Sequence, residues 1–213
     1  MDGTRPRMAI VIGGGGAPRF EAAVADWLTG LAHVGTGLEA TTIDLAAACL
    51  PADPPPVRAG TSDTGGTDGA DGAHGAGGSG RAGGSGDARP CSVRDLAPWL
   101  AGADAFVVVT AEYHHGAPGP LKTAVDWFDA EWWAKPVGFC SYGGRAGGAH
   151  AAHQLREVFA AAHAVPVRDA VGLRSPDTAL LAGAEGAADG MLRRLDWWAR
   201  ALRSARDRCP PAF

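Results

Sequence analysis

The chain has 213 residues, a hydrophobic fraction of 46% and a formal net charge of -4. This length can bury a substantial core and predicts a single domain over residues 1–213. The weakly acidic balance, without a run of lysine and arginine, argues against nucleic acid or a membrane surface as a partner. No stretch approaches the roughly 18 apolar residues of a transmembrane helix. The four cysteines are widely spaced, which predicts free thiols in a cytoplasmic protein.

Short apolar or β-branched runs alternate with helical patterns along the chain. The expected strands cover residues 8–12, 38–45, 105–109, 137–141 and 165–173. The expected helices cover residues 20–31, 92–100, 120–130, 149–162 and 187–206, and Ser92 is the predicted N-cap of the second. Such alternation predicts an α/β three-layer sandwich with a parallel sheet. With five strands, the flavodoxin-like order 2-1-3-4-5 is favoured.

The composition changes abruptly between the second expected strand and the second expected helix. Residues from about 52 to 89 are rich in glycine with small polar residues, and large apolar side chains are almost lacking. Such a segment cannot offset its ordering entropy by burial. We therefore expect a disordered glycine-rich insertion there, which leaves the rest of the chain to form the domain.

A glycine run joins the first expected strand directly to a helix. It consists of Gly13, Gly14, Gly15 and Gly16, and Arg19 follows at the start of the helix. A strand, a glycine-rich turn and a helix can place backbone N–H groups around a phosphate. The run matches neither the G-x-G-x-x-G dinucleotide fingerprint nor a G-K-[ST] nucleotide loop. A plain tight turn that needs glycine for positive φ remains the alternative.

Two further loops leave the third and fourth expected strands. In the order 2-1-3-4-5, the loops after strands 1 and 3 converge on one crevice, and the loop after strand 4 flanks it. These three loops suit a flat conjugated ligand with a phosphate tail, of which flavin mononucleotide (FMN) is the obvious candidate. The residues expected around it in the second and third loops are Ala111, Glu112, Tyr113, His114, Ser141, Tyr142, Gly143 and Gly144. Hydride transfer from nicotinamide to flavin needs no protein acid or base, so no catalytic residue is assigned.

Histidines suggest a metal only weakly in this sequence. His114 and His115 are adjacent, and adjacent residues rarely chelate one ion together. No third ligand stands near them in the sequence, so no metal site is expected. His150 and His153 are interpreted as surface residues of a helix, and Glu112 as a carboxylate that caps or hydrogen-bonds backbone rather than a general base.

Three segments together resemble one known family. They are EYHHGAPGPLK at 112–122, KPVGFCSYGGRAGG at 135–148 and QLR at 154–156. They are similar to the PEYN-type loop, the P-x-x-LKN helix start, the KPV strand and the SYGG turn of the NAD(P)H-dependent FMN reductases, which are flavodoxin-like proteins. The resemblance implies an FMN-dependent oxidoreductase that takes electrons from NADPH or NADH and reduces a flavin, a quinone or a similar small acceptor. It also implies a homodimer or homotetramer.

By position, the resemblance places the isoalloxazine contacts on two loops. They would be Glu112, Tyr113, His114, Ser141, Tyr142, Gly143 and Gly144. For Arg145, a grip on the 2′-phosphate of NADPH and a solvated loop charge are equally open.

The first loop departs from the pattern of that family. Gly14 stands where the family has serine, and Gly16 stands where it has its first arginine, so only Arg19 remains. Each lost charge-assisted contact costs about 1.5–3 kcal/mol, which is about ten- to a hundred-fold in affinity. We therefore expect weaker FMN retention than is typical. The alternative is a non-catalytic flavodoxin-like accessory or binding protein with an eroded phosphate loop.

Overall fold

The computed structural model describes residues 4–14, 16–53 and 89–212. The strands are β1 (Arg7–Ile12), β2 (Glu39–Asp44), β3 (Ala105–Ala111), β4 (Pro136–Tyr142) and β5 (Val165–Leu173). The α-helices are α1 (Pro18–Gly35), α2 (Cys91–Ala101), α3 (Gly119–Trp127), α4 (Ala149–Ala161) and α5 (Leu181–Arg208), with a short 3-10 turn η1 (Thr178–Leu180) before α5. The predicted insertion at about 52–89 lies almost entirely outside the described residues, so its disorder stays a prediction.

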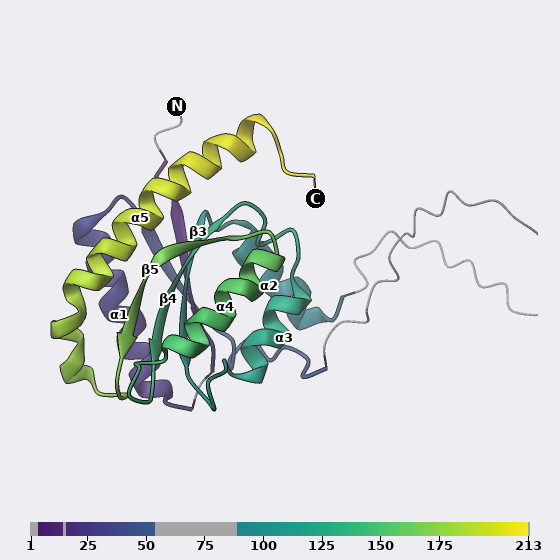
Figure 1. Cartoon of the computed structure of the whole chain (residues 1–213). Helices are drawn as coiled ribbons and strands as arrows, with labels where there is room; N and C mark the ends of the chain where they lie inside the picture. Colours follow the sequence, from purple (N-terminus) through teal and green to yellow (C-terminus); the bar gives the residue numbers. More distant parts are fainter. Residues whose placement is uncertain (1–3, 15, 54–88, 213) are drawn as a thin grey trace, which may run out of the picture.

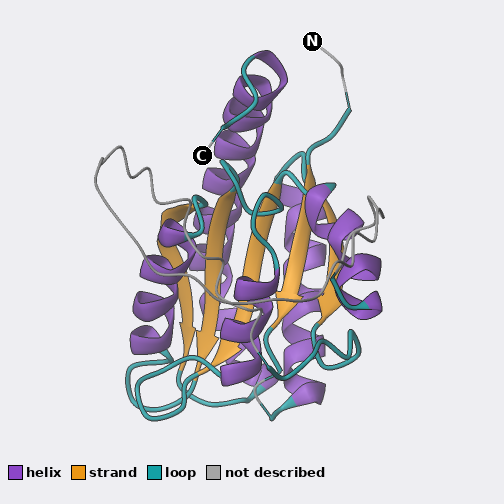
Figure 2. Ribbon diagram, turned by 90° about the vertical axis from the view of Figure 1, so that its right-hand side faces the viewer, coloured by secondary structure: helices purple, strands orange, loops and turns teal. Residues whose placement is uncertain are grey.

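The strands form one parallel sheet in the order β2-β1-β3-β4-β5, which confirms the flavodoxin-like prediction. The arrowheads in Figure 2 point to the same edge of the sheet. All residues of β3 and β4 are buried, which explains why both read as continuous apolar runs. In contrast, β2 lies at the edge and exposes most of its residues, which accounts for its threonines.

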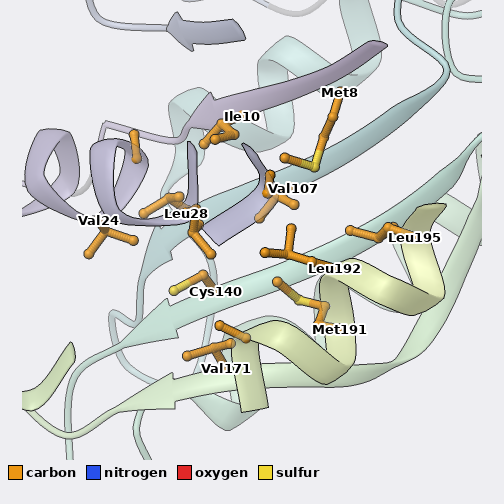
Figure 3. Packing of buried hydrophobic residues seen from close by; sticks show 14 of the residues in the cluster. Met8, Ile10, Val24, Leu28, Val107, Cys140, Val171, Met191, Leu192 and Leu195 are labelled. Carbon is orange, nitrogen blue, oxygen red and sulfur yellow. The ribbon is translucent and has the colours of Figure 1, made fainter. Parts of the chain in front are cut away.

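Helices cover both faces of the sheet, with α1 and α5 on one side and α2, α3 and α4 on the other (Figure 1). Alternate residues of β1 serve the two cores: Met8 and Ile10 face α1 and α5, whereas Ala9 and Val11 face the other helices. Figure 3 shows the first core, in which side chains of α1 and α5 meet those of the strands. Cys140 of β4 lies in this core, and burial raises the pKa of its thiol to about 12.

Several predicted boundaries are wrong. The first turn of α2 closes through the bond from Arg94 N–H to the Pro90 carbonyl, so the helix begins at Cys91 and Ser92 is not its N-cap. Helix α3 ends at Trp127 because Phe128 takes an extended backbone. These errors move helix ends without changing the order of elements.

Helix α5 begins at Leu181, earlier than predicted, and has 28 residues. Its first turns are rich in alanine and glycine, and Leu181 is their one large apolar side chain. The start signal lies upstream, where the carboxylate of Asp177 accepts a hydrogen bond from the N–H of Ala179 and caps η1, which leads directly into α5. The C-terminal part of α5 extends beyond the sheet (Figures 1 and 2). Among the described residues, no helix is both long and apolar enough to cross a membrane.

A buried lysine closes the end of α2. The ammonium of Lys135, directly before β4, donates to the carbonyl oxygens of Leu100 and Ala101, both at 2.9 Å. These carbonyls belong to the last turn of the helix, where they have no partner within the helix. Lys135 is only 5% exposed, and burial, with a smaller effect from the nearby Arg206, lowers its pKa to about 8.

Candidate functional site

The three loops expected to form the site lie side by side at the carboxyl edge of the sheet. The N–H of Gly13 donates to the carbonyl of Val109 at 2.8 Å, which ties the loop after β1 to β3. The N–H of Glu112 donates to the carbonyl of Tyr142 at 2.9 Å, which ties β3 to β4. Ala111 is buried as the last residue of β3 and pairs with Tyr142, so only its backbone is near the loops.

The loop after β1 remains open at its surface. Gly14 and Gly16 have φ of 72° and 88°, a conformation that favours glycine. A Cβ at Gly16 would lie 2.7 Å from the hydroxyl of Tyr113, so the second loop leans over the first. Among the described residues, no side chain caps the N-terminus of α1, whose first turn carries the exposed Arg19. Gly15 lies outside the described residues.

A cavity of about 550 Å³ adjoins this loop. It is lined by residues 17–20 of α1 and its N-cap and by residues 176–178 before α5. Its volume is within the range of small-molecule sites. A larger cavity of about 1010 Å³ lies at the opposite edge of the sheet, beside Arg7 and Glu39 at the amino ends of β1 and β2. Ligands of open parallel sheets bind at the carboxyl edge, so only the smaller cavity lies at the expected edge. Its lining comes from the start of α1 and the segment before α5, and includes no described residue of the second or third loop.

A buried tyrosine and glutamate lie beneath the crevice. The hydroxyl of Tyr142 donates to the carboxylate of Glu21 at 2.6 Å, and the ring of Tyr142 packs edge-on against Phe20. Burial and the carboxylate of Glu21 raise the pKa of Tyr142 above its ordinary value. Glu21 is 1% exposed and was missed in the sequence, although it shares the buried face of α1 with Phe20 and Val24. Because Tyr142 is 5% exposed, it fixes α1 to β4 rather than offering its ring to the surface.

The second loop contains a tight turn with two histidines. Tyr113 and Gly116 exchange backbone hydrogen bonds of 2.9 and 2.8 Å around His114 and His115. The histidines have φ of 47° and 67°, and positive φ at both central residues is what a type I′ turn requires. The turn leaves Tyr113 half-exposed and both imidazoles at the surface.

Glu112 caps helix α4 from across the sheet edge, in line with the expected backbone role. Its Oε2 accepts from the N–H groups of His150 at 2.9 Å and Ala151 at 3.3 Å. Burial opposes ionisation, but these two bonds and the imidazole of His150 together lower the pKa of Glu112. Gln154 adds a second link, because its Oε1 accepts from the N–H of Ala117 at 2.9 Å. The second loop is thus fastened to α4 at two points.

The third loop is closed on itself. The N–H of Gly148 donates to the carbonyl of Gly143 at 2.7 Å, and the buried Ser141 donates its hydroxyl to the carbonyl of Gly147 at 3.0 Å. Gly143 and Gly144 face Glu112 of the second loop. Arg145, at the tip, is exposed. The structure therefore brings Gly143 and Gly144 toward the second loop and places the side chain of Ser141 beneath the surface.

The sequence argument against a metal rested on the adjacency of His114 and His115 and on the lack of a third ligand near them in the sequence; in space, candidate ligands do lie near His115. The structure places Glu112 and His150 beside His115, with the ligand atoms of all three within 4.8 Å of one another. His150 is 38 residues from Glu112, so only the sheet topology brings them together. His114 and His153 are not part of this group.

The sequence profile of the NADPH-dependent FMN reductase family matches residues 6–176, which is most of the chain. The chain belongs to this family. The match includes all three loops and confirms the resemblance found in the sequence.

Two curated proteins are similar to this chain over short segments. An NAD(P)H-dependent FMN reductase of Schizosaccharomyces pombe is 49% identical over 59 residues, which are 28% of this chain and 29% of the relative. A quinone reductase of Escherichia coli is 39% identical over 74 residues, which are 32% of this chain and 39% of the relative. The aligned segments thus span less than half of either relative.

The fold is shared with a solved flavoenzyme. The structure is similar to that of FerB, an NAD(P)H:(acceptor) oxidoreductase of Paracoccus denitrificans, with a TM-score of 0.60 and 18% identity. The match covers 92% of this chain and 98% of FerB. At this identity, the likeness supports the fold.

Proposed function

We propose that this protein is an FMN-dependent oxidoreductase that takes electrons from NADPH or NADH and reduces a small acceptor such as a flavin or a quinone. The observation that carries the proposal is the open glycine loop with positive φ before the uncapped N-terminus of α1, at the carboxyl edge of a parallel sheet. Family membership supports the same conclusion.

The first loop fits the phosphate end of FMN. The N–H groups of a glycine run and the positive end of α1 attract an anion. The exposed Arg19 in the first turn adds a guanidinium. In this proposal Gly13, Gly14, Gly15 and Gly16 supply the backbone cradle, with Arg19 as its charged donor.

The second and third loops fit the flat ring system. The half-exposed Tyr113 offers an aromatic face beside the first loop, and the backbone of Gly143 and Gly144 lies against Glu112. His114, exposed in the turn, adds an imidazole at the same edge. FMN, when bound, supplies the hydride chemistry, and the chain contributes position and backbone donors for negative charge on the ring. Ser141 and Tyr142 act from below, by fixing the third loop and α1.

A binding experiment tests the phosphate part of the proposal. Dialysed protein is titrated with FMN and with riboflavin, which lacks the phosphate, while flavin fluorescence is followed. We expect saturable FMN binding and weaker riboflavin binding. Replacing Arg19→Ala should weaken FMN binding about ten- to a hundred-fold and leave riboflavin binding unchanged. The control is Arg193→Ala on α5, whose guanidinium pairs with Asp189 instead.

A turnover experiment tests the reaction. Oxidation of NADPH and NADH is followed with FMN present and a quinone or excess flavin as acceptor. Turnover with at least one nucleotide is expected. Binding of FMN without any turnover would contradict the oxidoreductase and favour the accessory protein, and equal binding of FMN and riboflavin would remove the phosphate role of the first loop.

Self-association is a separate part of the proposal. Trp99 of α2 and Trp197 of α5 expose 63% and 62% of their surface, and exposed aromatic residues are enriched at subunit interfaces. We expect a homodimer or homotetramer in light scattering coupled to size exclusion. A monomer at all concentrations would refute this part alone.

A further inference from the structure

Two histidines and a glutamate form a cluster between the β3–α3 loop and the start of α4. The rings of His115 and His150 stack with centroids 4.1 Å apart and an interplanar angle of 16°. The Nδ1 of His150 lies 3.3 Å from Oε1 of Glu112. Each residue can offer one ligand atom, and these atoms lie within 4.8 Å of one another. Two imidazoles and one carboxylate are a common ligand set for Zn²⁺.

The distance between Glu112 and His150 suits a tetrahedral ion. Bonds of about 2.0–2.1 Å at the tetrahedral angle separate two ligand atoms by about 3.3 Å. The Oε1 and Nδ1 atoms are 3.3 Å apart, so an ion could replace a proton between them without moving either side chain far. Two of the three ligand atoms are therefore already positioned.

The carboxylate has the support that metal-binding carboxylates usually need. Its Oε2 is held by the N–H groups of His150 and Ala151, which leaves Oε1 facing the imidazole. Hydrogen bonds of this kind fix the orientation of a ligand and limit the entropy lost on metal binding. The side chain of Glu112 is also nearly buried, which reduces competition from water.

His115 needs only a local movement to complete the set. The lone pair of an imidazole lies in the ring plane, and the two stacked planes are nearly parallel, so one ring must tilt before both nitrogens face the same ion. The side chains of His115 and His150 are exposed, and rotation of exposed side chains is fast and inexpensive. The backbone of His115 is held in the tight turn beside α4, so its ring stays within reach of the other two ligands as it rotates.

We infer that Glu112, His115 and His150 form a binding site for a divalent transition metal ion, Zn²⁺ foremost, with one coordination position left open. Imidazole and carboxylate ligands select such ions over Mg²⁺ and Ca²⁺, which prefer oxygen alone. An ion here would join the second loop to α4. The inference does not depend on flavin binding or turnover.

The test is a metal titration of the full chain after treatment with a chelator and in the absence of flavin and nucleotide. Zn²⁺ binding is measured by calorimetry, and Co²⁺ serves as a spectroscopic probe of the ligands. We expect one ion per chain and a Co²⁺ spectrum of nitrogen and oxygen ligands without thiolate charge transfer. This spectrum excludes the exposed Cys49, Cys91 and Cys209 as the source of binding.

Variants assign the site. His115→Ala and His150→Ala should each weaken binding about tenfold or more. The matched control is His153→Ala, which removes an exposed imidazole from the same helix but outside the cluster. Circular dichroism checks that each variant is folded. Absence of Zn²⁺ binding by the wild type, or binding as tight as in the wild type by the folded His115→Ala and His150→Ala variants, would overturn the inference. Neither result would bear on the FMN titration.

Discussion

Two glycine-rich loops leave the same edge of the sheet, yet the structure uses their glycines differently. In the loop after β1, Gly14 has open space around it and no side chain caps the helix that follows, as far as the described residues show. In the loop after β4, Gly148 is pressed against Tyr142 and Ser141 and takes part in a closed set of hydrogen bonds. The first loop leaves donors for a ligand, whereas the second is part of the packed scaffold. Composition alone does not distinguish the two.

Replacing a glycine by alanine should have its largest effect in the closed loop after β4. In Gly148→Ala, the φ of 77° costs about 1–2 kcal/mol, and the overcrowding costs about 1–3 kcal/mol more. The new Cβ would lie 2.7 Å from the backbone nitrogen of Tyr142, which cannot move independently of β4. Urea denaturation should show the lower free energy of unfolding. A loss below about 1 kcal/mol would mean that the loop is not as closely packed as described.

The buried Lys135, at the other end of β4, should make the stability of the protein depend on pH. The pKa of Lys135 is about 8 in the folded chain, against an ordinary 10.5. Between these values the unfolded chain binds more protons, so the wild type gains stability as pH rises from about 8 to 10.5. The shift corresponds to about 3 kcal/mol, which is a cost fully present below pH 8.

Lys135→Met provides the reference for this measurement. As pH rises from about 8 to 10.5, the free energy of unfolding of the wild type should increase relative to that of the variant. Tyr142, whose pKa is also raised, contributes equally to the pH dependence of both proteins, so its contribution cancels in the difference. A difference independent of pH would show that Lys135 is not buried as a charge.

One of the two tyrosines of the chain is buried in the scaffold, and the other lies at the surface. Tyr142→Phe removes the donor to the buried carboxylate of Glu21 and should cost about 1.5–3 kcal/mol of stability. Tyr113→Phe, in a half-exposed ring on the second loop, should change stability by less than about 0.5 kcal/mol. Urea denaturation of both variants measures the difference. Equal effects would contradict the division between the buried scaffold and the exposed surface.

Glycine-to-alanine substitution should cost less in the open loop after β1 than in the closed loop after β4. Gly14→Ala adds a Cβ that meets nothing within 4 Å, so only the φ of 72° opposes it, at a cost of about 1 kcal/mol. Denaturation alongside Gly148→Ala gives a direct comparison of one substitution in two loops. A loss in Gly14→Ala as large as in Gly148→Ala would show that both loops are packed scaffold.

The sequence predicted the sheet well because its central strands are buried on both faces and read as apolar runs, as Phe106–Val109 does within β3. It predicted helix ends poorly, since Pro90 and Asp177 determine them through local hydrogen bonds that no periodicity reveals. The convergence of the three loops followed from topology.

The contacts that the sequence did not predict join residues far apart in the chain. Glu21 meets Tyr142 only through the packing of α1 on the sheet, and Glu112 meets His150 only through the adjacency of β3 and β4. Such pairs depend on strand register and on where each helix begins, which single residues do not encode locally. The polarity of Glu21 on an otherwise apolar helix face was the one available signal.

The buried position of Cys140 makes its thiol a reporter of core opening. Three of its four cysteines are exposed, and the fourth is sealed in the core with its thiol held in the protonated form. An alkylating reagent needs an accessible thiolate. It should therefore modify Cys49, Cys91 and Cys209 at once and reach Cys140 only when β4 leaves the sheet. The rate at which Cys140 is alkylated, followed by mass spectrometry, would measure the rate at which the core opens under native conditions. The measurement needs no engineered label.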